Sequence, residues 1–169
     1  IEAALFAFRS PLARGAVLAD EVGLGKTIEA GLIISQLWAE KKRCILCIVP
    51  ASLRTQWNRE LIEKFFIEAE VLEAKNYNEC RERGVPNPFD RPGKIILCSY
   101  QFARSKEEDV RKVPWDLVVI DEAHRLRNVY RRDNKIARSI RDSIGNRPKV
   151  LLTATPLQNS LMELFGLVS

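Results

Sequence analysis

Hydrophobic residues along the chain gather in short runs that alternate with longer amphipathic segments. The short runs are almost purely apolar, as in strands that are buried on both faces of a parallel sheet. They predict strands at Gly15–Asp20, Cys44–Val49, Ala69–Ala74, Ile95–Ser99, Leu117–Ile120 and Val150–Thr153. The longer segments predict helices at Lys26–Lys41, Ser52–Phe66, Lys106–Lys112, Asn134–Ser143 and Ser160–Val168. This alternation predicts an α/β fold, a mostly parallel sheet with helices on both faces.

Length and composition fit one domain over residues 1–169. The chain is 46% hydrophobic and 29% charged, which is ordinary for a globular protein, and no apolar run approaches the roughly 18 residues that a membrane helix needs. Glycine and proline gather at Tyr77–Gly93, which predicts a loop excursion there. Because the chain begins and ends within helix-like segments, we expect a piece of a longer protein, truncated at both ends.

A turn between the first predicted strand and the next helix has the pattern of a phosphate-binding loop. It runs through Asp20, Glu21, Val22, Gly23, Leu24, Gly25, Lys26 and Thr27. Its glycines let backbone N–H groups face inward, and the N-terminus of the following helix adds partial positive charge. Lys26 would reach the β- and γ-phosphates of a nucleoside triphosphate, and Thr27 would place its hydroxyl on Mg²⁺. The strict pattern has glycine where this chain has Asp20, so the loop alone does not decide the function.

Paired carboxylates follow the predicted strand Leu117–Ile120. In an open parallel sheet the ligand crevice lies outside the carboxyl ends of the strands, so Asp121 is expected near the phosphates that Lys26 holds. Asp121 would hold Mg²⁺ directly or through water, and Glu122 would polarise the attacking water. The alternative is a buried strand followed by a solvated acidic turn.

The cysteines and the net charge say less about function than the two motifs do. Cys44 and Cys47 stand three apart on a predicted strand and point to opposite faces, so they cannot share one zinc ion, and we expect thiols in a reducing cytosol. The net charge is +5, and residues 125–147 hold eight Lys or Arg against two Asp. This basic segment fits contact with a nucleic-acid backbone, a solvated helix face or a neighbouring domain.

Two further strand-to-turn segments carry polar groups. Pro50, Ala51 and Ser52 lead from a strand into a helix N-terminus, which can bind backbone phosphates without reading sequence. Trp57, on that helix, is expected to be a helix-packing residue and not one that stacks on a base. The second segment, Leu151–Asn159, could link the nucleotide site to another ligand.

Together these four segments resemble the first ATPase lobe of the Swi2/Snf2 branch of superfamily 2 helicase-like translocases. The matching motifs are Asp-Glu-x-Gly-Leu-Gly-Lys-Thr, Val-Pro-x-Ser-Leu with Gln-Trp, Asp-Glu-Ala-His and Leu-Thr-Ala-Thr-Pro-Leu-Gln-Asn, in that order. Asp20 is the residue that this family carries in its phosphate loop. The details around the loop look most like the bacterial and archaeal subgroup, which includes the RNA-polymerase-associated type.

The resemblance implies a RecA-like P-loop lobe that binds Mg·ATP through the phosphate loop, with Lys26, Asp121 and Glu122 in catalysis and Thr27 and Asp121 on Mg²⁺. It assigns the coupling of nucleotide state to the DNA surface to His124, Thr153, Thr155 and Gln158. It also places Pro50, Ala51, Ser52 and Tyr100 on segments that follow one strand of duplex DNA.

The expected activity is that of a DNA-dependent ATPase that moves on double-stranded DNA and remodels protein–DNA complexes. Its expected partners are duplex DNA, a second RecA-like lobe of the same chain, and RNA polymerase or another DNA-bound protein, in the cytoplasm at the nucleoid. Without that second lobe, this fragment is expected to hydrolyse ATP barely. An RNA helicase, a restriction-enzyme motor subunit and a non-catalytic protein-binding scaffold remain alternatives.

Overall fold

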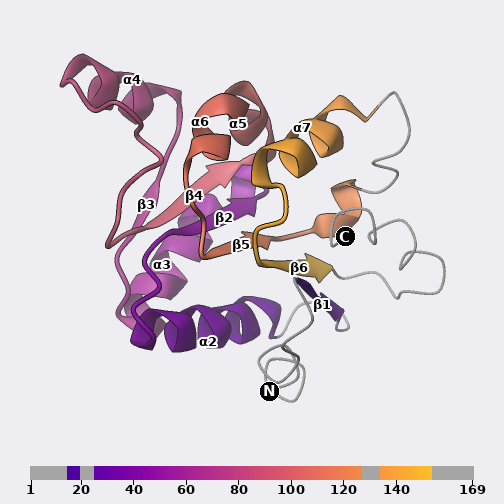
Figure 1. The fold of residues 1–169 in the computed structure, drawn as a ribbon. Coiled ribbons are helices and arrows are strands. Elements are labelled where there is room, and N and C mark those ends of the chain that lie inside the picture. The colour runs from indigo at the N-terminus through magenta and orange to yellow at the C-terminus, as the bar shows by residue number, and fades with distance from the viewer. Residues whose placement is uncertain (1–14, 20–24, 127–133, 154–169) are drawn as a thin grey trace.

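The computed structural model of the chain describes residues 15–19, 25–126 and 134–153. Within these residues six strands form one sheet, paired in parallel throughout, in the order β1-β6-β5-β2-β4-β3 (Figure 1). The strands are β1 (Gly15–Ala19), β2 (Ile45–Val49), β3 (Ala69–Val71), β4 (Ile95–Ser99), β5 (Leu117–Ile120) and β6 (Lys149–Thr153). The predicted α/β class with a parallel sheet is confirmed.

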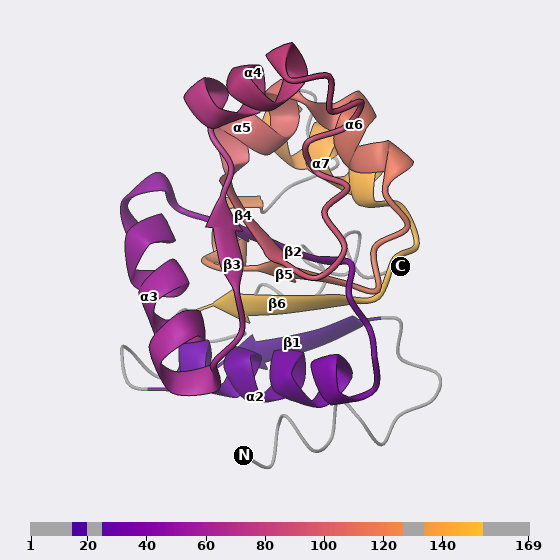
Figure 2. The same ribbon diagram turned by 90° about the vertical axis from the view of Figure 1, so that its left-hand side faces the viewer.

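Helices cover both faces of this sheet, as Figures 1 and 2 show. On one face lie α2 (Lys26–Ala39) and α3 (Arg54–Phe65), and on the other lie α5 (Tyr100–Ser105), α6 (Glu107–Lys112) and α7 (Lys135–Ile144). The remaining elements are α4 (Ala74–Glu82) and two 3₁₀ turns, η1 (Ala51–Leu53) and η2 (Ala123–Leu126). In the described part of the chain, no helix is both long enough and apolar enough to cross a bilayer.

Alternating strand residues divide the core into two layers. Ile45, Cys47 and Val49 of β2 pack with α2 and α3, whereas Leu46 and Ile48 pack with the helices of the opposite face. Every residue of β2 is therefore buried, which explains why its sequence is continuously apolar. The expectation that Cys44 and Cys47 point to opposite faces of the sheet is also confirmed, because Cys44 packs against one core layer and Cys47 belongs to the other.

The region after β3 differs from the prediction. The strand expected at Ala69–Ala74 ends at Val71, and helix α4 begins at Ala74. The loop expected over Tyr77–Gly93 is therefore wrong for residues 77–82, which are helical. Tyr77 and Cys80 are buried three residues apart on one face of α4, and this helical spacing outweighs the glycine and proline residues that follow. Helix α5 was also missed.

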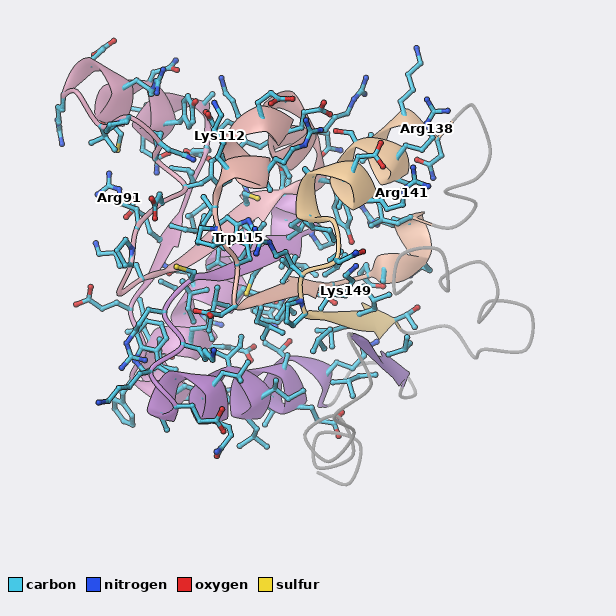
Figure 3. The ribbon with its side chains drawn as sticks, viewed as in Figure 1. Arg91, Lys112, Trp115, Arg138, Arg141 and Lys149 are labelled. Carbon is cyan, nitrogen blue, oxygen red and sulfur yellow. The ribbon has the colours of Figure 1, made fainter. Side chains whose placement is uncertain are left out.

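A buried lysine begins the last strand. The Nζ atom of Lys149 donates a hydrogen bond of 2.8 Å to the carbonyl of Gly145 at the end of α7, and burial lowers the pKa of the amine (Figure 3). The unfolded chain therefore binds this proton more tightly than the folded chain. The free energy of unfolding should accordingly rise with pH between the lowered pKa and the ordinary value of 10.5.

Lys149→Met should make the protein more stable at pH 7 by about 0.5–1 kcal/mol, because it removes a buried charge. The gain is small because the substitution also removes the hydrogen bond from Nζ to the carbonyl of Gly145. Urea unfolding at pH 7 and pH 10 measures it, and the gain should shrink at pH 10. Lys112→Met, at an exposed position of α6, is the matched control and should change nothing. A loss of stability at pH 7 would contradict this account.

Candidate nucleotide site at the carboxyl ends of the strands

Three strands end side by side at one edge of the sheet. Ala19 of β1 is level with Thr153 of β6, and Ile120 of β5 is level with Leu151. Helix α2 begins at Lys26 on this edge, shortly after β1 ends. The registers therefore bring the start of α2, the end of β6 and the residue after Ile120 into one region, as the carboxyl-end rule predicts.

Asp121 is the residue that follows β5, and it is held tightly. It is 6% exposed, and its backbone N–H donates to the carbonyl of Ile48 at 2.9 Å. Its Oδ2 atom accepts a hydrogen bond of 2.9 Å from Nε1 of Trp57, and its Oδ1 atom accepts one of 2.8 Å from the backbone N–H of Glu122. Both carboxylate oxygens thus have fixed directions.

The charges around Asp121 include Lys26. Burial has the largest effect and raises the pKa of the Asp121 carboxyl, while the hydrogen bonds from Trp57 and Glu122 lower it. The charge of Glu122 raises this pKa, and the charge of Lys26 lowers it. The charge of Lys26 thus bears on the carboxyl of Asp121, although 94 residues separate the two in sequence.

Glu122 and His124 form the turn after Asp121. Glu122 has a φ of 53°, a left-handed conformation that non-glycine residues rarely adopt and that is often found at functional sites. Its Oε2 atom lies 3.1 Å from Nδ1 of His124, which forms an ion pair only when the imidazole is protonated. His124 Nδ1 is buried and makes no well-aligned hydrogen bond in the described part of the chain.

The other predicted nucleotide and coupling residues divide into two groups. Gly25, Thr27 and Thr153 lie at the same edge, and a side chain added at Gly25 would meet open space, so the backbone there is accessible. The loop residues Asp20, Glu21, Val22, Gly23 and Leu24 and the coupling residues Thr155 and Gln158 lie outside the described residues.

An open pocket of about 530 Å³ lies beside this edge, at the ends of β3 and β4. Its lining combines two cations, one carboxylate, hydroxyl groups and an amide, contributed by Arg54, Glu73, Ala74, Lys75, Ser99, Gln101, Phe102 and Ser105. Arg54 donates to the carbonyl of Ala51 at 3.1 Å and to Oε2 of Glu73 at 3.2 Å. The segment of Ala51 and Ser52, both exposed, therefore borders a basic and hydroxyl-rich pocket.

Two of the predicted nucleic-acid residues are buried. Pro50 and Tyr100 do not present their side chains to solvent, so a ligand could reach only their exposed neighbours. For the side chain of Tyr100 the structure corrects the prediction, because its hydroxyl donates a hydrogen bond to the backbone carbonyl of Asp121. That the segments of Pro50, Ala51, Ser52 and Tyr100 follow one strand of duplex DNA stays a prediction.

The sequence interpretation missed Trp57 as a site residue, and it named Tyr100 for a nucleic-acid segment but not as a donor to Asp121. Trp57 is a buried packing residue as expected, but its indole also donates a hydrogen bond to Asp121. A general signal was available, since buried indole and phenol groups usually find a hydrogen-bond partner. Nothing in the sequence, however, named that partner.

The basic segment after the acidic turn lies on a different surface. In its described part, Arg138 and Arg141 stand on α7, on its outer side in Figure 3. Arg141 pairs with Asp142 at 2.7 Å, while the described residues offer Arg125 and Arg138 no such partner. These arginines fit a solvated helix face as well as a contact surface.

The parallel sheet and its polar carboxyl edge are typical of a nucleotide-binding α/β domain, and comparisons with known proteins identify its family. The family model described as "SNF2-related domain" matches residues 5–169. The chain therefore belongs to the SNF2-related domain family.

Two relatives are named for their activity or association. The "Uncharacterized ATP-dependent helicase YqhH" of Bacillus subtilis is 42% identical over 159 residues, 91% of this chain and 25% of YqhH. The "RNA polymerase-associated protein RapA" of Yersinia pseudotuberculosis is 40% identical over 149 residues, 84% of this chain and 15% of RapA. This chain thus spans a quarter or less of the length of either relative.

A solved structure shares the fold. It is the "Sulfolobus solfataricus SWI2/SNF2 ATPase core in complex with dsDNA", with a TM-score of 0.73 and 23% sequence identity. The match covers 99% of this chain and 32% of that one. The RecA-like architecture inferred from the motifs is confirmed.

Proposed function

We propose that this chain is the ATP-binding lobe of a DNA-dependent ATPase that moves on double-stranded DNA and remodels protein–DNA complexes. The observation that supports it most is that α2 begins with Lys26 at the edge of the sheet where the buried carboxylate of Asp121 follows β5. That arrangement suits a metal-bound polyphosphate, whose metal meets the carboxylate and whose oxygens meet the ammonium.

The residues present fit Mg·ATP. Asp121 is a buried carboxylate without an ion-pair partner within 4 Å among the described residues, so a cation would offset the cost of its burial. Asp121 and the hydroxyl of Thr27 are the residues that would hold Mg²⁺, and Lys26 and the N-terminus of α2 would hold the phosphates. The bound metal would supply electrostatic stabilisation of the charge that develops on the phosphates.

Glu122 would then act on the attacking water. Its side chain is one-quarter exposed, and it leaves the chain next to the fixed carboxylate of Asp121. A carboxylate in this place can orient a water and accept its proton. The imidazole of His124 lies 3.1 Å from Oε2 of Glu122, so it would respond to the bound nucleotide and pass that change to the neighbouring turn.

The pocket beside η1 supports contact with a phosphate backbone. Arg54 and Lys75 supply positive charge there, and Ser99 supplies a hydroxyl, a combination that fixes phosphates without reading base sequence. The dsDNA complex of the structural neighbour and the RNA-polymerase association of RapA point the same way for this family. RNA polymerase or another DNA-bound protein is our proposed target, in the cytoplasm at the nucleoid.

Nucleic-acid stimulation of ATP hydrolysis by the intact protein tests the proposal. Duplex DNA should raise the rate more than RNA of equal length, whereas an RNA helicase would show the reverse order. Arg54→Ala and Lys75→Ala should each weaken duplex binding uniformly across sequences and reduce the slope of log K against log salt by about one. Lys94→Ala is the control, because Lys94 stands before β4 at the opposite end of that strand and pairs with Glu70. Unchanged binding in both pocket variants would contradict the assigned surface.

A further inference from the structure

Asp121 is held from both sides of the sheet by aromatic side chains. Trp57, on α3, belongs to the core layer of one face and donates to the Asp121 carboxylate. Tyr100, the first residue of α5, belongs to the core layer of the other face and donates to the Asp121 backbone carbonyl. One residue at the end of β5 thus connects the two helical layers.

These two hydrogen bonds are buried away from water. Trp57 is 1% exposed, Tyr100 is 4% exposed and Asp121 is 6% exposed, so water cannot replace either donor. A buried donor or acceptor that loses its partner pays the cost of its desolvation. The two hydrogen bonds therefore restrict the positions that Asp121 can occupy relative to α3 and α5.

Both donors lie on segments that line the pocket proposed for nucleic acid. Trp57 stands three residues after Arg54 on α3, and Tyr100 lies between Ser99 and Gln101. A ligand that binds Arg54 or Ser99 contacts the same short segments that hold Asp121. Two short segments, one in α3 and one at the start of α5, therefore connect the pocket to the nucleotide edge.

The hydrogen bond from Tyr100 also bears on Glu122. It holds the carbonyl of the peptide bond that joins Asp121 to Glu122, while the N–H of the same peptide donates to Asp121 Oδ1 at 2.8 Å. That peptide is therefore fixed at both ends, just before the residue with a φ of 53°. The orientation of the Glu122 side chain depends on it.

We propose that Trp57 and Tyr100 are positioning residues that transmit occupancy of the pocket lined by Arg54 and Ser99 to Asp121 and Glu122. Trp57 sets the direction of the carboxylate, and Tyr100 sets the peptide that leads into Glu122. This inference rests on the proposed function, because it assumes that the pocket and the carboxylates serve one ATPase cycle.

Fluorine NMR of the intact protein labelled with 5-fluorotryptophan tests the link without measuring turnover. The resonance of Trp57 is assigned by its absence in Trp57→Phe, and that of Trp115 by its absence in Trp115→Phe. Mg²⁺ with a non-hydrolysable ATP analogue should shift the Trp57 resonance, and duplex DNA alone should shift it as well. Trp115 should stay unmoved, because its indole donates to the carbonyl of Val110 at 2.9 Å, away from the site.

Paired substitutions separate positioning from packing. Trp57→Phe should raise the Mg²⁺ concentration for half-maximal binding of a fluorescent ATP analogue about tenfold, as expected for a lost hydrogen bond to a charged group. Trp115→Phe, which also removes a buried indole hydrogen bond of 2.9 Å, should leave that concentration unchanged. Tyr100→Phe should reduce the stimulation of ATP hydrolysis by duplex DNA at least threefold. Tyr77→Phe, which removes a hydroxyl bonded to Asp109, should not.

The outcomes distinguish this inference from the proposed function. If the wild-type protein binds no Mg·ATP analogue, both fail. If it binds the analogue while the Trp57 resonance stays still, and Trp57→Phe matches Trp115→Phe, the inference alone is overturned. If Trp57→Phe does not fold, the comparison of Tyr100→Phe with Tyr77→Phe decides the question.

Discussion

Glu122→Gln should lower the rate of ATP hydrolysis by the intact protein about 10²–10⁴-fold, the usual contribution of a general base. The amide has the size and shape of the carboxylate, so the left-handed turn and the bond from the Glu122 N–H to Asp121 are retained. The amide cannot accept a proton from water. Affinity for Mg·ATP should consequently stay within a few-fold of wild type while turnover is lost, and single-turnover hydrolysis with a parallel binding titration measures both.

The matched control is Glu108→Gln on α6. Glu108 is exposed and pairs with Arg111 at 2.7 Å, remote from the edge where β5 ends. This variant should hydrolyse ATP at the wild-type rate. If Glu122→Gln does the same, Glu122 is not the base, and the chemistry of this edge must be assigned to another group.

The strands were the most predictable part of the fold. The runs that form β2, β4 and β5 are apolar without interruption because both faces of each strand are buried, and short runs of this kind are typical of a central parallel strand. Their ends were correct to within a residue. The order of the strands, in contrast, follows from pairing between distant segments and appears nowhere in the local pattern.

Helix α4 shows how nearby glycine and proline residues can mislead a prediction of secondary structure. The glycine and proline residues near it drew attention to a loop, but they begin only at Gly84, after the helix has ended at Glu82. Asn76 accepts a hydrogen bond from the Glu73 N–H at 2.7 Å and fixes the start of the helix. Neither residue is a strong helix-start signal by itself, so the sequence alone favoured the loop.

The residues of the candidate site also differ in how well the sequence predicts them. The phosphate loop and the paired carboxylates were recognisable because their chemistry requires particular residue types at particular spacings. The donors to Asp121 were not, since an indole on α3 and a phenol on α5 meet β5 only after the sheet has formed. Tyr100 was named only for its segment: its neighbours line the pocket, whereas its own side chain is buried.

Lys26→Ala should remove most ATP binding and hydrolysis. Each hydrogen bond between a lysine and a charged oxygen contributes about 1.5–3 kcal/mol, so affinity for Mg·ATP should fall about 10–150-fold. Turnover should fall further, because the ammonium also faces the charge that develops as the γ-phosphate leaves. A titration with a fluorescent ATP analogue and a steady-state hydrolysis assay measure the two effects.

The same substitution removes a charge that lowers the pKa of Asp121, so protonation of this carboxyl should become easier in the variant. Loss of Mg²⁺ binding should therefore begin at a higher pH than in the wild-type protein. Lys112→Ala, on the exposed side of α6, should alter neither affinity nor this pH dependence. Wild-type turnover in Lys26→Ala would show that Lys26 does not hold the nucleotide, and it would contradict the site assigned to Lys26 and Asp121.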